Sequence, residues 1–564
     1  MSIEAEPQAS SSTAAPSKEP KLIPVLSSRW ALRGAHVAVV GLFCTLFMLL
    51  NHLPLRNTDL WGHVVFGRAV LDQHAVPTVD PLLPLAEGMR IVDVHWLSQT
   101  IFAAVDRWGG PEALVGLFTL VVWSTYVVLG RTFFLQTKSL GLTTLLTLAV
   151  VLVGWSRIAT IRPENFAMLL FAVLLWMQFG RRARRAESVL TDDTRGDALL
   201  WVGIPLVAGL WANLHCSFPI VVGTLGCFWF GRVVEVAWHE RNFKAVFTDR
   251  EMRRQLYWLE LALAATLVNP YGIDAWIEAV RFSSNLNLRE IVEWSPLVVI
   301  GIGGREFAVA CVVLAVILRH SRQAMNPADV LLLALFGFAA VMQIRMSGWF
   351  AAVWGVTIAP HLADVVGRWF QRAESAALVD EEEIDTTDYR TPALRYRNTL
   401  LCIVMIWLTF AFSTFSRPLL GGAPRPQETL LGDTTPIRAG DFLKASKLSG
   451  LAFNPQHWGD WLGMNAPSGL KMFATTNIHL MPRNVWLDYL RVLRGDTGWD
   501  STLDKYNVRV LIVDKKDQAT LLHALKTAPD WVRVFEDDQA MILRRKSAQP
   551  AAAQPAASTA AAHP

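Results

Sequence analysis

The chain has 564 residues, of which 52% are hydrophobic and 23 are tryptophan. A soluble protein of this length would be more polar, so the composition excludes an ordinary soluble enzyme. The net charge of +4 is too small for a chain of this size to indicate a nucleic-acid partner. All five cysteines fall in or beside apolar runs, so we interpret them as small buried residues and expect no disulfide framework.

Residues 1–28 are rich in Ser, Ala, Pro and Glu, a composition that predicts a disordered tail. The first apolar run begins near Trp30, too late for a signal peptide, and it lacks a small-residue cleavage site. Apolar runs of bilayer-spanning length then recur and predict about eleven transmembrane helices. They lie near 35–53, 112–130, 141–156, 164–179, 198–214, 216–238, 255–270, 304–319, 327–344, 348–366 and 399–415.

Basic residues set the expected orientation of these helices in the membrane. Arg29 and Arg33 precede the first run and place the N-terminus in the cytoplasm. We expect residues 29–416 to form the transmembrane domain, with a first outer loop at 54–111 and a loose, acidic cytoplasmic loop at 367–398. Counting onward from the first run, the most basic loops all fall on the cytoplasmic side; they are 180–188, 239–255 and 319–323.

After the last apolar run the chain emerges outside, where residues 417–546 are predicted to form a small extracytoplasmic α/β domain. Helical apolar spacing marks 482–493 and 517–528, and low-complexity Ala/Pro/Gln sequence at 547–564 predicts a second disordered tail. The sequence therefore predicts an α-helical polytopic membrane protein with a C-terminal α/β domain. Strands of that domain are expected at 471–476, 508–514, 531–537 and 540–545.

Ionisable residues gather at the ends of the apolar runs on the outer side. Arginines there run against the topology rule, and ionisable groups at membrane depth indicate function. Forked guanidinium donors bind phosphate, and a nearby carboxylate acts as a general base or a metal ligand. Together they suit a lipid-linked phosphate donor at the outer interface. The group comprises Asp59, His63, Asp93 and His95 in the first outer loop, Arg157, Arg162 and Glu164 in one turn, Glu293 on a predicted short interfacial helix, and Arg345.

Short motifs follow one another in a recognisable order along the chain: Asp59-x-Trp61-x-His63, "VPTVDPL", "VDVHWLSQ", "RPENF", "WANLH", "NPYG" and "IVEWSP". This order resembles a group of uncharacterised bacterial integral membrane proteins related to the GT-C glycosyltransferases. The GT-C class includes protein O-mannosyltransferases, the lipid A aminoarabinose transferase and the oligosaccharyltransferase catalytic subunit. The resemblance covers most of the chain and implies a GT-C-like domain in the inner (cytoplasmic) membrane of a bacterial cell envelope.

The resemblance also implies roles for these residues. In such enzymes a carboxylate of the first outer loop is a base or a metal ligand, and the sugar comes from a polyprenyl-phosphate carrier. Here that carboxylate is Asp59, the expected catalytic residue, and Leu60 stands where a second acid is usual. A divalent metal is a candidate cofactor, with Asp59, His63, Asp93 and His95 as candidate ligands. The expected substrate-binding residues are His63, Asp93, His95, Arg157, Arg162, Glu164, Glu293 and Arg345.

Each candidate also has a purely structural interpretation. Asp59 is placed to cap the start of a helix, and Arg162 to hold its turn through a salt bridge. Asp93 and His95 are placed to begin a capped helix that lies flat on the membrane. His215, in the turn "WANLH", fits a hydrogen bond between spans better than contact with substrate.

Three functions therefore remain open. The first is a transferase that moves a sugar from a membrane-lipid carrier to an extracytoplasmic acceptor. The second is a non-catalytic scaffold or carrier-binding protein of the cell envelope, which the single acid at Asp59 favours. The third is a transporter, against which the sequence shows no inverted repeat and no paired broken spans. An outer cavity with Asp59 and arginines favours the first, and full pairing of these charges favours the second.

Overall fold

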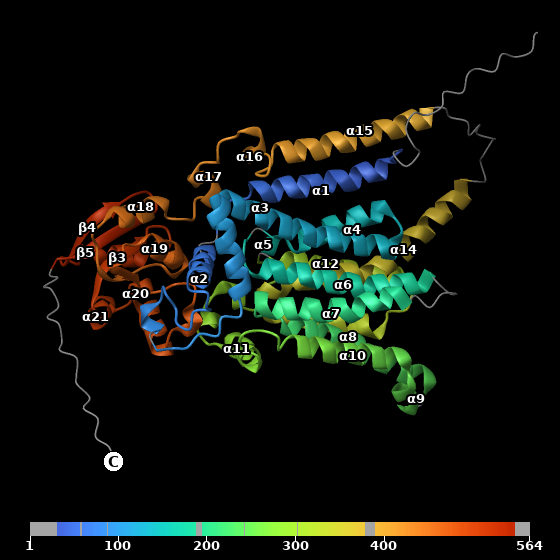
Figure 1. Ribbon diagram of the computed structural model, residues 1–564, viewed down its shortest axis with the longest axis horizontal. Coiled ribbons are helices and arrows are strands. Elements are labelled where there is room, and N and C mark those ends of the chain that lie inside the picture. The colour runs from blue at the N-terminus through green and yellow to red at the C-terminus, as the bar shows by residue number, and fades with distance from the viewer. Residues whose placement is uncertain are drawn as a thin grey trace, which may run out of the picture.

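Long helices that lie side by side form most of the molecule (Figure 1). The computed structural model describes residues 31–546 except 57–58, 87, 159, 188–193, 242, 302 and 378–389, so both predicted tails lie outside it. Each predicted apolar run overlaps one of the long helices. These are α1 (Gly34–His52), α3 (Trp96–Thr137), α4 (Leu140–Val153), α6 (Glu164–Glu187), α7 (Thr194–Leu214), α8 (Pro219–Glu240), α10 (Arg250–Ala265), α12 (Gly304–His320), α13 (Pro327–Met342), α14 (Ser347–Ala377) and α15 (Arg390–Ala411).

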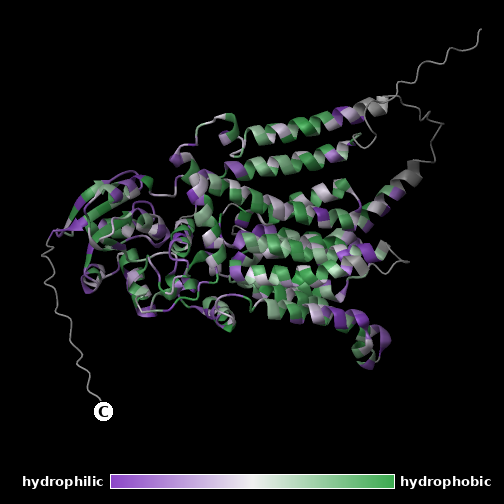
Figure 2. Ribbon diagram, viewed as in Figure 1, coloured by the Kyte–Doolittle hydropathy of each residue, from purple (hydrophilic) through white to green (hydrophobic). Residues whose placement is uncertain are grey.

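Within the described part of the chain, six helices are long and apolar enough to cross a membrane: α1, α3, α6, α7, α8 and α14, the last counted with the turn before it. Helices α4 and α13 are shorter and also apolar. Figure 2 shows hydrophobic residues along most of each helix and hydrophilic residues gathered toward the ends. Large apolar side chains such as Val202, Phe338 and Trp407 are exposed on the bundle, which fits a lipid environment. The chain is a multi-pass membrane protein.

A kink in α3 separates its first part, up to Trp108, from its longer second part in the bundle. Gly109 and Gly110 have non-helical backbone angles, with φ +64° at Gly110, and Pro111 follows. Proline cannot donate a helical hydrogen bond, so the kink falls here. The first part of α3 packs on α2 (Asp59–Gln73). At this contact a Cβ on Gly67 would lie 1.9 Å from the Gln99 carbonyl oxygen. This glycine lets the two helices touch and fixes α2 at the end of the bundle.

The C-terminal part forms a five-stranded sheet in the order β2-β1-β3-β5-β4. Strand β1 is parallel to β2 and β3, whereas β5 is antiparallel to β3 and β4. The predicted α/β domain is confirmed, but β1 was not predicted because four residues are too few to show an alternating pattern. The strands are β1 (Gly450–Phe453), β2 (Leu470–Met472), β3 (Val508–Asp514), β4 (Trp531–Glu536) and β5 (Ala540–Arg545).

Short helices complete the C-terminal domain and the connections in the bundle. In the domain they are α16 (Arg417–Leu420), α17 (Gln427–Leu431), α18 (Ile437–Ala445), η6 (Gln456–Trp458), α19 (Gly459–Asn465), η7 (Ile478–Leu480), α20 (Arg483–Arg494), α21 (Trp499–Lys505) and α22 (Ala519–Leu525). In the bundle they are η2 (Pro84–Ala86), α5 (Trp155–Ile158), α9 (Phe243–Thr248), α11 (Ile273–Ser284), η3 (Leu288–Glu290), η4 (Val292–Trp294) and η5 (Ile344–Met346).

The C-terminal domain packs on the end of the bundle that carries α2 (Figure 1). Trp461 of α19 and Trp61 of α2 are both buried, with ring centroids 5.2 Å apart. A Cβ at Gly62 would lie 2.7 Å from Asp460 Oδ1, so α2 and α19 touch through a glycine. Burial raises the pKa of Asp460 well above its ordinary value. The domain and α2 therefore form one continuous packed unit at this end of the bundle.

Two local expectations were wrong. The loop expected at 367–398 is helical at both ends, because α14 continues to Ala377 and α15 begins at Arg390. Good helix formers such as Arg, Gln and Ala continue α14 beyond its apolar part. Glu293 was expected on a short interfacial helix and lies on the single 3-10 turn η4, since Ile291 before it and Ser295 after it are extended.

Candidate functional site

A cavity of about 300 Å³ lies between the helix ends and the C-terminal domain. The bundle contributes α2, the segment before α3, the turns before α6 and α8, and the η4 and η5 turns. The domain closes the other side with residues around η6 and η7. Seven of the nine residues predicted from the sequence line this cavity; they are Asp59, His63, Asp93, His95, Arg162, Glu293 and Arg345.

Arg162 connects three elements on the wall of this cavity. Its Nε donates to Asp59 Oδ2 at 2.7 Å, and its Nη1 donates to Glu293 Oε2 at 2.5 Å. Burial opposes its charge, but these two carboxylates outweigh that effect and raise the pKa of Arg162. The other oxygen of Asp59, Oδ1, is buried and has no hydrogen-bond partner among the described residues. Asp59 is thus held by one oxygen and unpaired at the other.

Arg157 and Glu164, the other two predicted residues, do not line this cavity but contact residues that do. Glu164 Oε2 accepts from Arg157 Nη2 and from Arg345 Nε, each at 3.2 Å, and Oε1 accepts from Trp349. Arg157 Nη1 also lies 3.4 Å from Glu293 Oε1. Burial alone would raise the pKa of Glu293, but the arginines around it lower the pKa to about 2. Three arginines and three carboxylates therefore form one network with balanced charge.

A second, smaller cavity of about 50 Å³ adjoins this network inside the bundle. Apolar residues of α3, α5, α6 and α14 line it, together with Arg157 and Glu164. Arg162 and Arg345 line both cavities. The side chain of Arg157 also has a buried Nε without a hydrogen-bond partner in the described structure. The guanidinium groups therefore lie at the boundary between a polar cavity and an apolar one.

Histidines form a further part of the wall of the large cavity. Asp93 Oδ1 accepts from the backbone N–H of His95 at 3.1 Å and from Gln99 Nε2 at 3.1 Å, and the same Gln99 Nε2 is 3.3 Å from His63 Nδ1. Burial lowers the pKa of His63 to about 4 and that of His95 well below its ordinary value, so both rings are neutral near pH 7. Burial raises the pKa of Asp93 to about 7.

The four candidate metal ligands do not come together as one site. Among the described residues, only two groups of three potential ligands have ligand atoms close enough to share a metal, and neither contains Asp59, His63 or Asp93. His95 belongs to the first group, with His215 and Cys216. The second group is His457, Asp514 and Asp517 in the C-terminal domain.

Several residues on the cavity wall were not predicted from the sequence. His215 and Cys216 were interpreted as a hydrogen-bonding residue and a buried thiol, although adjacent His and Cys side chains in one outer turn are a signal for soft-metal binding. The Cζ atom of Arg345 lies over the ring of Trp294, 5.4 Å from its centroid. The C-terminal domain adds Gln456, His457, Thr476, Asn477 and His479, none of which was expected to line the site.

Comparisons with known proteins identify the architecture. No protein-family model and no curated protein sequence matches the chain. Solved structures do, beginning with the oligosaccharyltransferase of Archaeoglobus fulgidus in its apo form, a GT-C superfamily member. That match has a TM-score of 0.51 at 10% identity and covers 85% of this chain and 69% of the other. The chain has the GT-C fold.

Two further structures match this GT-C chain. The same archaeal enzyme, tethered to an acceptor peptide with an NVT sequon, has a TM-score of 0.52 at 12% identity, covering 92% of this chain and 75% of the other. ArnT from Cupriavidus metallidurans, in the apo state, has a TM-score of 0.48 at 14% identity, covering 90% of this chain and 97% of the other. The resemblance to GT-C enzymes expected from the sequence is confirmed at the level of the fold.

Proposed function

We propose that the chain is an inverting glycosyltransferase that moves a sugar from a polyprenyl-phosphate carrier to an acceptor at the outer face of a bacterial inner membrane. Asp59 takes the proton of an acceptor hydroxyl, whose oxygen attacks the anomeric carbon of the sugar. The bond between that carbon and the carrier phosphate breaks, and the phosphate leaves with the bonding electrons. Arg162 and Arg345 stabilise the charge that develops on it.

The observation that carries this proposal is the state of Asp59. Arg162 holds Oδ2 at 2.7 Å, while Oδ1 is buried and has no partner in the part of the chain that the structure describes. Asp59 lines the 300 Å³ cavity. An unpaired carboxylate oxygen is costly in a buried site, which indicates a group kept for a ligand. A positioned base needs this arrangement, with one oxygen fixed and the other free to accept a proton.

The two adjoining cavities support the place of the carrier. Arg162 and Arg345 line both, so a phosphate beside them has a polar space on one side for the sugar. On the other side lie Val122, Tyr126 and Met168 inside the bundle, where the first isoprene units fit the apolar surroundings. Guanidinium groups suit this position because their forked donors bind phosphate oxygens.

A hard divalent metal at Asp59 does not fit the residues present. Mg²⁺ and Ca²⁺ need several oxygen ligands, and one oxygen of Asp59 already pairs with Arg162. Neither group of potential ligands among the described residues includes Asp59. The arginines, and not a metal bound at Asp59, therefore stabilise the leaving phosphate in the proposed reaction.

The alternative function, a non-catalytic scaffold that binds lipid carriers, is favoured by one observation. Arg157, Arg162 and Arg345 each pair with a carboxylate, so the charge of every arginine in the network is balanced without a substrate. Donor binding by the transferase then requires a phosphate to compete with Glu164 or Glu293 for these arginines. The two functions differ in one respect that an experiment can measure, which is whether Asp59 is needed for turnover.

The test expresses wild type or Asp59→Asn in a strain from which the gene for this protein has been deleted. Mass spectrometry then compares the envelope glycans and the carrier-linked sugars of the two strains. Asp59→Asn keeps the size of the side chain but cannot take a proton, so it should accumulate loaded carrier. The matched control is Asp72→Asn on the same helix, which breaks only an exposed ion pair with Arg107. Equal glycans in wild type and Asp59→Asn, at equal protein levels, would favour the scaffold.

A further inference from the structure

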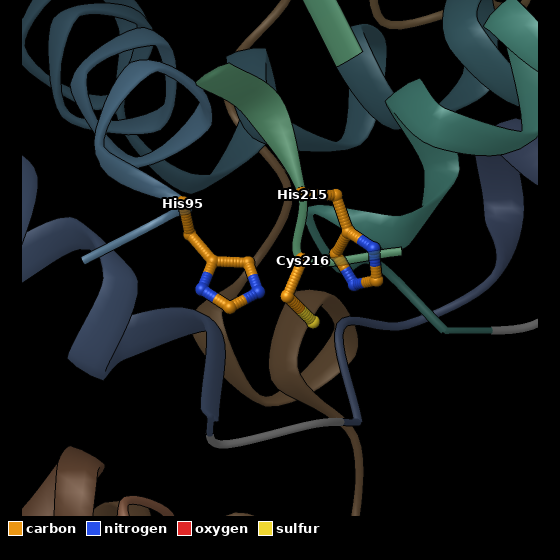
Figure 3. A group of neighbouring side chains, drawn as sticks. All are labelled: His95, His215 and Cys216. Atoms are coloured by element: carbon orange, nitrogen blue, oxygen red, sulfur yellow. The ribbon is translucent and has the colours of Figure 1, made fainter. Parts of the chain in front are cut away.

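A cluster of soft metal-binding side chains lines the cavity beside Arg345. His95, His215 and Cys216 each offer one ligand atom, and these atoms all lie within 4.8 Å of one another. Figure 3 shows the sulfur of Cys216 between the two imidazole rings, with a ring nitrogen of each turned toward it. The rings of His95 and His215 have centroids 5.0 Å apart in an edge-to-face arrangement. All three residues line the 300 Å³ cavity.

The far nitrogen of each ring has a polar neighbour of its own. His215 Nδ1 accepts the backbone N–H of Ser217 at 3.1 Å and lies 2.7 Å from Ser217 Oγ, and His95 Nδ1 lies 3.9 Å from Asp93 Oδ1. For Nε2 of His215 to bind a metal, Nδ1 must carry the ring proton and donate it to Ser217 Oγ in place of accepting the backbone N–H. Metal-binding histidines in proteins commonly have such a second partner. Asp93 is itself held by Gln99 and by the His95 backbone, so the carboxylate is fixed in place.

We propose that His95, His215 and Cys216 bind a zinc ion, with its fourth position open to the cavity. Zinc prefers tetrahedral sites of nitrogen and sulfur, and three protein ligands plus one open position are typical of its reactive sites. Bond lengths near 2.0 Å to nitrogen and 2.3 Å to sulfur require ligand atoms about 3.5 Å apart. The present spacing shortens to that value through side-chain rotation, because His95 and Cys216 border open space.

Binding displaces the thiol proton, so Zn²⁺ and the thiolate together add one positive charge to this wall. Arg345 Nη2 lies 3.4 Å from His215 Nε2 and must turn away toward Glu164, its existing partner. The open fourth position then faces the same cavity as Asp59.

Metal content tests the site on the full-length chain, purified without a histidine tag and dialysed against buffered micromolar zinc. Wild type should retain about one zinc per chain. Cys216→Ser and His95→Gln should lose at least ten-fold in zinc affinity, in line with loss of a ligand. Matched controls are Cys227→Ser on α8 and His479→Gln on the cavity wall, which should keep the metal.

Cobalt substitution separates this site from His457, Asp514 and Asp517, which offer no sulfur. Only cobalt at Cys216 gives a thiolate-to-metal charge-transfer band, which Cys216→Ser should abolish and Cys227→Ser should not. If the variants fail to fold, the site can still be tested by an alkylation measurement on the wild-type protein alone. Zinc should protect Cys216 from alkylation, scored by peptide mass spectrometry, and a chelator should restore the reaction. Unchanged alkylation with zinc, or a cobalt spectrum without the band, would overturn the site whether or not the chain transfers sugar.

Discussion

Arg162 and Asp59 lie 103 residues apart in the chain, yet the Nε of one is 2.7 Å from the Oδ2 of the other. This contact joins α2 to the turn before α6. Arg162 extends the connection to Glu293 on η4 at 2.5 Å. Three separate segments at this end of the bundle are therefore held by one guanidinium group, and the proposed base is oriented by the same group that would meet the carrier phosphate.

Removing Arg162 should destabilise the protein as well as inactivate it. Arg162→Gln leaves Asp59 and Glu293 without their shared partner, and breaking a buried ion pair costs about 3 kcal/mol or more. Thermal unfolding in detergent, followed by tryptophan fluorescence, should show a clear fall in the midpoint. Arg107→Gln is the control, because Arg107 is 46% exposed and its pair with Asp72, itself 61% exposed, is worth about 1 kcal/mol or less. Equal shifts for both variants would refute the bridging role.

Acid should weaken the network through Glu293. The arginines hold its pKa at about 2, below the ordinary 4.5. Because the folded pKa is the lower one, this carboxylate stabilises the fold above pH 4.5 and loses that contribution as pH falls toward 2. Glu293→Gln should therefore flatten the dependence of the unfolding midpoint on pH in this window. Glu290→Gln, which removes a more exposed pair with Arg483, should leave the slope unchanged; identical slopes for wild type and Glu293→Gln would contradict the prediction.

Gly62 should prove necessary for the contact between α2 and the C-terminal domain. A methyl group there would lie 2.7 Å from Asp460 Oδ1, and Asp460 is itself buried against Thr476. Gly62→Ala should therefore push α19 away and expose the domain boundary to limited proteolysis. Gly41→Ala on α1 meets only Met405 Sδ at 3.9 Å and should be neutral. Proteolysis at the wild-type rate in Gly62→Ala would show that the interface yields without cost.

Replacing Arg345 by lysine should separate charge from geometry. Lysine keeps the positive charge but lacks the forked donors that contact Glu164 and stack over Trp294. If Arg345 stabilises the departing phosphate, product formation in the strain assay should fall roughly 100-fold, the usual cost of losing one such donor. Protein levels, measured by immunoblot, should stay equal. Wild-type glycan levels in Arg345→Lys would remove this residue from the proposed mechanism.

Much of the architecture follows from apolar length alone. Every predicted run overlaps a helix because about twenty apolar residues have no other stable form in a bilayer. The kink in α3 also has a local cause in the sequence, since Gly109, Gly110 and Pro111 end one helical segment and begin another. The prediction of a loop at 367–398 was wrong because it relied on apolar length alone. The apolar pattern stops there, but polar residues with high helix propensity continue the helix.

The site was predicted residue by residue but not as a geometry. Sequence placed Asp59, Arg162 and Glu293 on one side of the membrane, but their pairing depends on how α2 and η4 pack, which no local pattern encodes. The cavity wall from the C-terminal domain was missed because Thr476 and Asn477 follow a short strand and carry no distinctive spacing. Cys216 was interpreted as a buried apolar residue, since its neighbours His95 and His215 come together only in three dimensions.

The most direct test of the central claim is native mass spectrometry of the purified chain with the lipids it retains from the membrane. We predict that Asp59→Asn carries a polyprenyl phosphate with a sugar attached, whereas wild type carries the bare polyprenyl phosphate or none. Fragmentation of the bound lipid would identify the sugar from the mass difference. Retention of only ordinary phospholipids by both proteins would contradict a polyprenyl-phosphate donor, and with it the proposed transferase.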